Sequence, residues 1–210
     1  MIRETFPVGP LQCNCTILGD PATGNALVVD PGDDADEIIR RLAAHGLRAA
    51  ALVHTHAHFD HVGATRRVSE ATKASIHLHE ADLFLYENLA MQGAAFGFEF
   101  DDVLPVSRFV KNGDVIGAAG VEVEVLHTPG HTPGSVCFSL GGTRPVLFSG
   151  DTLFQGSIGR TDLWGGDVRA IERSIKTRLY TLPEGTLVIP GHGPETTIGE
   201  ERVTNPFVRA

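Results

Sequence analysis

The chain has 210 residues and a formal net charge of −9 at pH 7, and 42% of its residues are hydrophobic and 20% charged. This composition is that of an ordinary globular protein and excludes a disordered or fibrous chain, and the length favours one domain over residues 1–210. The acidic balance, without a dense cluster of Lys and Arg, argues against a nucleic-acid partner, because such a partner requires a basic face.

The first half of the chain predicts short strands and helices. Residues 13–18 and 26–29 are apolar runs separated by a turn-rich segment, and both predict strands. A helix is expected from Asp34 to Gly46, because its first acidic residues suit the helix dipole and its apolar residues share one face. The next expected elements are a buried strand at 49–53, a helix at 64–71, a strand at 75–78 and a helix at about 80–89.

The second half of the chain changes its pattern. Residues 91–104 contain small and aromatic residues without a period, and both a loop or lid and a poorly patterned helix fit them. From Phe109 apolar residues recur at every second position, and Val121, Val123 and Val125 predict a strand with one solvent-exposed face. The remaining expected elements are strands at 135–140, 146–148 and 186–189 and a helix at 167–179. Two mixed sheets packed face to face, with helices outside, satisfy this order of elements.

A histidine-rich segment follows the strand at 49–53 directly. It contains His56, His58, Asp60 and His61. Residues two apart in an extended segment point to one side, so His56 and His58 can present two imidazoles to one cation. Asp60 and His61 follow at the turn and can face a second cation nearby. Buried His and Asp are costly when they have no partner, so this spacing indicates a metal site.

Three later segments repeat one pattern, in which a strand is followed by a glycine-rich turn and a residue of ligand type. These residues are His131, Asp151 and His192. Glycine permits the positive φ and the close backbone approach that such loops need. His54 also lies near the cluster, but it points the other way along the strand, so we expect it to be packed or to support the ligands.

The ordered series resembles the metallo-β-lactamase superfamily, in which His-x-His-x-Asp-His is followed by a lone His, a bridging Asp and a last His. The resemblance covers nearly the whole chain and implies an α+β fold, the four-layer αββα sandwich. It assigns the first metal to His56, His58 and His131. It assigns the second metal to Asp60, His61 and His192, with Asp151 bridging both.

The resemblance implies a hydrolase with two divalent metal ions. Zinc suits the His and carboxylate ligands, and iron and manganese tolerate the same set. A metal-bound hydroxide would attack an acyl carbon, and Asp60 would orient the hydroxide and accept a proton as the catalytic carboxylate.

Two stretches are similar to the glyoxalase II branch, the hydroxyacylglutathione hydrolases. These stretches are Asp151 to Asp162, with its Gly-Arg-Thr-Asp end, and Glu201 to Phe207. The similarity implies a small-molecule thioester substrate such as S-lactoylglutathione, whose thiolate leaves without a strong general acid. Zinc β-lactamases commonly carry Cys at the position that corresponds to Asp151, so hydrolysis of antibiotics is not expected.

One departure from this branch concerns the way glutathione is held. Larger glyoxalase II enzymes carry a C-terminal helical domain with basic residues, whereas about eighteen residues follow His192 here, so that domain is expected to be absent. Arg160 and Lys111 are candidate cations for glutathione. Each has a simpler role, since Arg160 can pair with a nearby aspartate and Lys111 begins a hairpin turn.

Other functions fit the same residues. A persulfide dioxygenase has a similar Gly-Arg-Thr-Asp stretch and would use one iron on His56, His131 and Asp151. A lactone hydrolase would use the full ligand set. A metal-loaded sensor without catalysis is a further alternative, although no ligand that the chemistry needs is missing.

Cysteine usage and hydropathy give the expected compartment. Cys13, Cys15 and Cys137 form no disulfide framework and predict small buried thiols, which favours a reducing cytoplasm. The N-terminus lacks an apolar signal core, and no later run is long enough to span a bilayer, so no membrane partner is expected.

Overall fold

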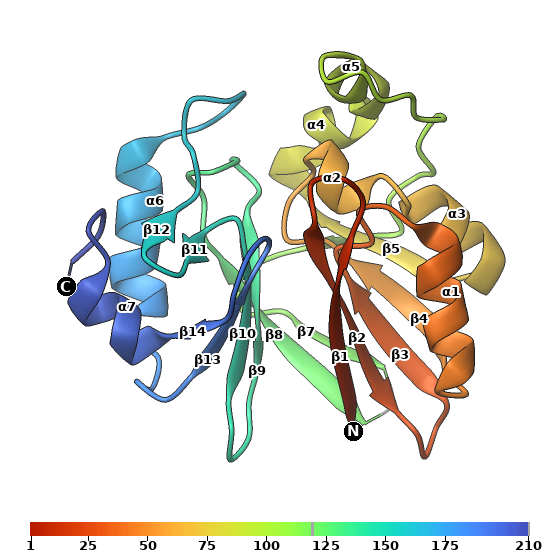
Figure 1. The fold of residues 1–210 in the computed structure, drawn as a ribbon, viewed down its shortest axis with the longest axis horizontal. Coiled ribbons are helices and arrows are strands. Elements are labelled where there is room, and N and C mark those ends of the chain that lie inside the picture. Colours follow the sequence, from red (N-terminus) through yellow and green to blue (C-terminus); the bar gives the residue numbers. More distant parts are fainter. Residues whose placement is uncertain (119, 210) are drawn as a thin grey trace.

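A six-stranded mixed sheet forms the first half of the molecule (Figure 1). The computed structural model describes residues 1–118 and 120–209. The strands of this sheet, in spatial order, are β1 (Ile2–Val8), β2 (Cys13–Asp20), β3 (Asn25–Val29), β4 (Arg48–Val53), β5 (Ser75–His79) and β6 (Arg108–Val110). The pairs β1–β2 and β2–β3 are antiparallel, and β3 to β6 run parallel.

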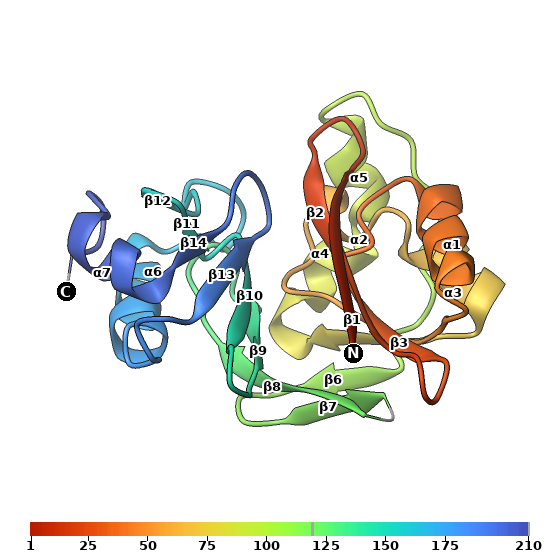
Figure 2. The same ribbon diagram turned by 60° about the horizontal axis from the view of Figure 1, so that its bottom comes forward.

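A second six-stranded mixed sheet forms the other half. Its strands, in spatial order, are β14 (Thr196–Thr197), β13 (Leu187–Pro190), β10 (Val146–Gly150), β9 (Val136–Leu140), β8 (Val121–His127) and β7 (Val115–Ala118). Only β10 and β13 pair in parallel among its described strands. A separate hairpin consists of β11 (Leu153–Phe154) and β12 (Ser157–Ile158). The turn between β6 and β7 connects the two sheets, as Figure 2 shows.

Helices cover the outer face of each sheet. On the first sheet these are α1 (Ala35–Ala44) and α3 (Thr65–Thr72), and on the second they are α6 (Val168–Ser174), the π-helical turn η2 (Ile175–Leu179) and α7 (Ile198–Thr204). At one end of the first sheet lie α2 (Phe59–Val62), η1 (Glu80–Asp82), α4 (Leu83–Glu87) and α5 (Leu89–Ala94). The predicted four-layer αββα sandwich is therefore confirmed.

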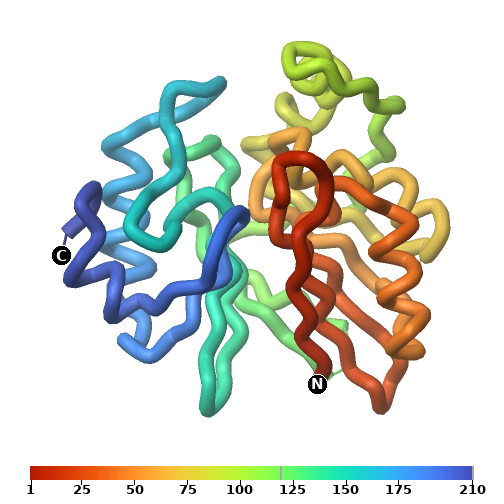
Figure 3. Tube along the Cα trace, viewed as in Figure 1, coloured from red at the N-terminus to blue at the C-terminus, as the bar shows by residue number. Residues whose placement is uncertain are grey.

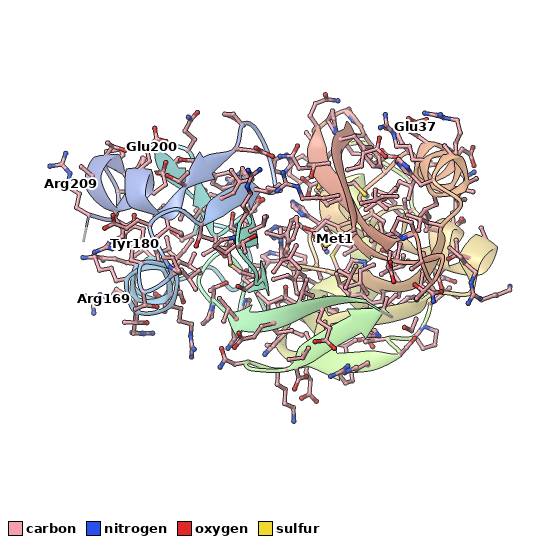
Figure 4. All side chains as sticks on the ribbon, turned by 90° about the horizontal axis from the view of Figure 1, so that it is seen from below. Met1, Glu37, Arg169, Tyr180, Glu200 and Arg209 are labelled. Atoms are coloured by element: carbon pink, nitrogen blue, oxygen red, sulfur yellow. The ribbon has the colours of Figure 1, made fainter. Side chains whose placement is uncertain are left out.

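The largest apolar cluster lies between the two sheets. Leu27 and Val53 of the first sheet pack there against Val123, Phe138 and Phe148 of the second. The period-two pattern of β8 explains its contribution, because alternate side chains of a strand point to opposite faces. Figure 4 shows side chains filling the space between the sheets, whereas charged residues such as Glu37 and Arg169 lie at the periphery.

The structure corrects the predicted elements at several places. The predicted helix at 80–89 is divided, because α4 ends at Glu87 and α5 begins at Leu89, with the Asn88 side chain donating to the Phe84 carbonyl. Strand β1 and helix α7 were not predicted at all. Among the described residues, no helix combines the length and the apolar character needed to cross a membrane.

Candidate metal centre

The candidate ligands lie at one end of the sandwich, in loops of both sheets. His56, His58, Asp60 and His61 follow β4 of the first sheet. The other three follow β8, β10 and β13 of the second sheet, and they are His131, Asp151 and His192. The structure therefore brings all seven predicted residues together at the end where parallel strands of both sheets finish.

Two groups of ligand atoms are formed. The ligand atoms of His56, His58 and His131 lie within 4.8 Å of one another, and those of Asp60, His61 and His192 do the same. In the first group, His58 Nδ1 lies 2.9 Å from His131 Nε2. In the second group, His192 Nε2 lies 3.1 Å from an Asp60 carboxylate oxygen. These two groups match the two sets that the resemblance implied, and a third group, formed by His56, His61 and Asp151, lies across them.

Asp151 lies between the two groups. Its Oδ2 is 3.6 Å from His131 Nε2, and its Oδ1 is 3.4 Å from His61 Nε2 and 3.8 Å from His192 Nε2. Each carboxylate oxygen thus faces a different group. His56 Nε2 and Asp151 Oδ1 are buried and have no hydrogen-bond partner among the described residues. Burial of such atoms is costly without a partner, so the residues fit divalent cations.

Backbone carbonyls fix the ring tautomers of two histidines. His131 Nδ1 lies 2.7 Å from the carbonyl oxygen of Arg160, and His192 Nδ1 lies 3.0 Å from that of Leu11. A carbonyl only accepts hydrogen bonds, so both Nδ1 atoms carry the proton. In the neutral rings both Nε2 atoms then hold a lone pair directed into the cluster. Figure 3 shows the turn that contains Leu11 beside the loop of His192.

Asp30 supports two further histidines and was missed in the sequence. Its carboxylate accepts from the Thr55 amide and the Thr55 hydroxyl, both at 2.7 Å, and from His61 Nδ1 at 3.1 Å. Because the Thr55 hydroxyl donates to Asp30, it accepts from His56 Nδ1 at 3.1 Å. Asp30 therefore leaves the Nε2 atoms of both His56 and His61 free to bind metal. A sequence pattern could have indicated Asp30, since this residue follows a predicted strand and precedes Pro-Gly, as a residue at a functional turn often does.

Asp82 connects the two ligand loops and was also missed. Its buried carboxylate accepts from the Ala57 amide at 3.1 Å, the Thr132 hydroxyl at 2.7 Å and the Gly134 amide at 2.6 Å. Burial raises the pKa of Asp82 to about 6, although these three donors oppose the shift. Ala57 separates His56 from His58, and Thr132 follows His131. Asp82 thus fixes the relative position of loops from the two sheets.

Asp82→Ala is expected to reduce the free energy of unfolding by at least about 2 kcal/mol, because it leaves three buried donors without an acceptor. Urea unfolding of the metal-free protein measures this. Glu80→Ala is the matched control, since Glu80 is an exposed acid two residues away, and it should change the stability by less than about 0.5 kcal/mol. Equal stability of Asp82→Ala and the unsubstituted protein would contradict this role.

The surroundings favour the metal-binding form of His56, His58 and Asp151. They do not favour that form of His61 and His192, whose pKa is raised although burial opposes this shift, with Asp60 and Asp151 among the causes. Burial, together with the neighbouring imidazoles, lowers the pKa of His56 well below its usual value and that of His58 to about 3. Burial alone would raise the pKa of Asp151, but His61, His131 and His192 outweigh it and hold this pKa below its usual range. Neutral imidazoles and an ionised carboxylate are the protonation states that coordinate a cation.

The other histidines and the cysteines have structural partners. His54 is buried, and its ring nitrogens contact the His77 carbonyl at 2.9 Å and the Thr65 hydroxyl at 2.8 Å, which confirms the packed role that was predicted. The three cysteines are buried and free, as expected. Burial raises the pKa of Cys13 to about 12 and that of Cys137 to about 11, so both are neutral thiols.

A cavity of about 560 Å³ opens beside the ligands. Its lining includes His58, Asp60, His131 and Asp151, and it also includes Arg160. Lys111, the other candidate cation for substrate, lies in the turn between β6 and β7, where its amide donates to Asp114, and it is not part of this lining. Of the two candidates, the structure therefore places Arg160 alone at the cavity.

Helix α7 supports the segment that leads to Arg160. The buried Glu201 carboxylate accepts from the Gly156 amide at 2.9 Å, and the Asn205 side chain donates to the Ser157 carbonyl at 3.0 Å. These contacts explain why the Glu201–Asn205 stretch occurs together with the Gly-Arg-Thr-Asp stretch: the first holds the hairpin that precedes the second.

The sequence profile of the metallo-beta-lactamase superfamily matches residues 8–192. The chain belongs to this superfamily. A relative from Haemophilus influenzae, named hydroxyacylglutathione hydrolase GloC, is 40% identical over 99% of this chain and 98% of its own length. The predicted metallo-β-lactamase fold and the resemblance to the glyoxalase II branch are thus confirmed by similarity.

Two solved structures have the same fold over nearly their whole length. The B3 metallo-beta-lactamase BLEG-1 is 39% identical, covers 100% of both chains and has a TM-score of 0.92. TTHA1623, solved in a di-iron-bound form, is 42% identical, covers 96% of this chain and 98% of its own, and has a TM-score of 0.86. Members of this superfamily are metallo-hydrolases, and the His and Asp cluster described above is consistent with divalent metals in this chain.

Proposed function

We propose that this protein hydrolyses a thioester, with S-lactoylglutathione as the first substrate to test. The observation that carries the proposal is the pair of ligand groups with Asp151 between them, beside an open cavity. The 40% identical relative named hydroxyacylglutathione hydrolase supports the thioester class.

The seven ligand residues have separate roles in this proposal. His56, His58 and His131 would hold one cation, Asp60, His61 and His192 would hold the other, and Asp151 would contact both. Divalent cations bound in this way lower the pKa of water to about 7 and so supply a nucleophile at neutral pH. Zinc is the metal that the donor set favours, and the di-iron form of TTHA1623 makes iron the second metal to test.

Asp60 is proposed to act as a base as well as a ligand. Its carboxylate lines the cavity, and one of its oxygens faces His192 Nε2. Its other oxygen would accept a proton while the acyl carbon is attacked. The leaving thiolate is stable without protonation, so the cavity needs no strong general acid on the side of the thiol.

The decisive measurement combines metal content with turnover. Protein purified without chelator should contain two divalent ions per chain and release thiol from S-lactoylglutathione, and removal of the metal should abolish the release. Zinc, iron and manganese are added back in separate samples. No thiol release in any of these samples would contradict the proposal.

The same samples distinguish thioester hydrolysis from two other reactions. One iron per chain, with oxygen uptake on glutathione persulfide, would indicate the dioxygenase instead. Nitrocefin is included because a chain that is 39% identical is named a B3 metallo-beta-lactamase. Its hydrolysis without thioester hydrolysis would move the function to β-lactams.

A further inference from the structure

The mouth of the cavity is formed by exposed apolar side chains. The lining residues Leu11, Met91, Phe96 and Trp164 are 45%, 53%, 58% and 51% exposed. They come from separate segments, since Leu11 lies between β1 and β2, Met91 lies in α5, and Trp164 lies in the loop before α6. In Figure 1 α5 and this loop stand on opposite sides at the same end of the molecule. Large apolar side chains that gather in this way mark a binding site.

The apolar surface continues from the mouth to the ligands. Phe59, Leu85 and Leu163 line the same cavity as His58 and Asp151. A molecule that lies against this surface therefore has one end at the metal ligands. This continuity favours a substrate of the centre as the occupant, because a partner docked only at the rim would not reach the ligands.

The cavity contains little charge to hold an ionic substrate. Among the described residues of its lining, Arg160 is the only basic side chain apart from the histidines. Its guanidinium donates two hydrogen bonds of 2.8 Å to Asp162, so the positive charge is largely compensated. Glutathione carries two carboxylates and an ammonium group, and these charged groups would have to remain in solvent at the mouth. The apolar surface is then left for the acyl side of the thioester.

We infer that the preferred substrate is a thioester whose acyl group is large and apolar, such as an aromatic acyl group, and that Phe96 and Trp164 select it. This inference rests on the proposed function and specifies its substrate class. Binding to the apolar surface removes a phenyl group from water and buries more apolar area than a methyl group would. A thioester with a phenyl group on its acyl side should therefore have a kcat/KM at least about tenfold higher than one with a methyl group at the same position.

The test compares S-mandeloylglutathione with S-lactoylglutathione, because the two thioesters differ only by phenyl in place of methyl. We expect the ratio of their kcat/KM values to be about ten or more. Trp164→Ala and Phe96→Ala should each lower this ratio to about three or less. Phe207→Ala is the control, since Phe207 is 62% exposed and does not line the cavity, and it should leave both values unchanged. A ratio near one in the unsubstituted protein would overturn the inference.

Binding gives a second readout that does not depend on turnover. The chain contains a single tryptophan, so the fluorescence of Trp164 reports occupation of the cavity. The thioethers S-benzylglutathione and S-methylglutathione carry the two sizes of apolar group and cannot be hydrolysed. We expect the benzyl compound to bind at least about tenfold more tightly. If it does so while no thioester is hydrolysed, the proposed function fails and the apolar cavity stands. Equal affinities overturn the inference whatever the turnover.

Discussion

Asp151→Asn is expected to lower the rate of thioester hydrolysis by about three orders of magnitude. The asparagine retains one oxygen but places an amide nitrogen, which does not donate a lone pair, toward one of the two ligand groups. A bound cation contributes several kcal/mol to the stabilisation of the transition state, and each 1.36 kcal/mol corresponds to a factor of ten in rate. The metal content should fall from two ions per chain to one or fewer, as elemental analysis measures.

The control for this variant is Asp36→Asn. Asp36 is 85% exposed on α1, where it pairs with Arg67 and is not one of the ligand residues, so both metal content and rate should stay at the level of the unsubstituted protein. The bridging role of Asp151 is refuted if Asp151→Asn still binds two ions and turns over at more than about a tenth of the original rate.

Asp30→Asn is expected to lower metal affinity by about 10- to 100-fold, although Asp30 touches no cation in the proposed centre. The backbone of Asp30 has a φ of 49°, which asparagine adopts readily, so the local conformation should be retained. The amide group of asparagine can donate to His61 Nδ1, whereas the carboxylate can only accept from it. The proton of His61 would then move to Nε2 and block the ligand atom.

A metal titration followed by competition with a chelator measures the affinity, and ¹⁵N chemical shifts of the imidazoles report the tautomer of His61. Thr55→Val tests the second contact of Asp30, since it removes the hydroxyl between Asp30 and His56 and should disturb His56 while leaving the His61 tautomer unchanged. An unaltered His61 tautomer in Asp30→Asn would show that Asp30 does not orient this ligand.

The ligands themselves were predictable because each one lies in a local pattern. A strand, a glycine-containing turn and a ligand-type residue occur together at His131, Asp151 and His192, and the histidine-rich segment follows β4 directly. Parallel strands place such turns at one end of a sheet. The strands β8 to β10 and β13 were predicted for a related reason, since each has a clear apolar pattern.

The residues that support the ligands were not predictable, because their partners are distant in sequence. Asp82 lies at the start of a predicted helix, where an acid usually serves the dipole, and its partners Ala57 and Gly134 are 25 and 52 positions away. Strand β1 was missed because Arg3, Glu4 and Pro7 interrupt its apolar pattern, and its position at the sheet edge tolerates them.

The division of the ligands between loops of both sheets couples metal supply to the lifetime of the protein. A complete set of donors exists only when the two halves of the chain have docked, so a cation would bind the native state more tightly than the separated halves. The native state gains stability from this binding only while the free metal concentration is comparable to the dissociation constant or exceeds it. In a metal-starved cell we therefore expect a larger fraction of the chains to open and be degraded, so that the abundance of the protein follows the availability of its cation.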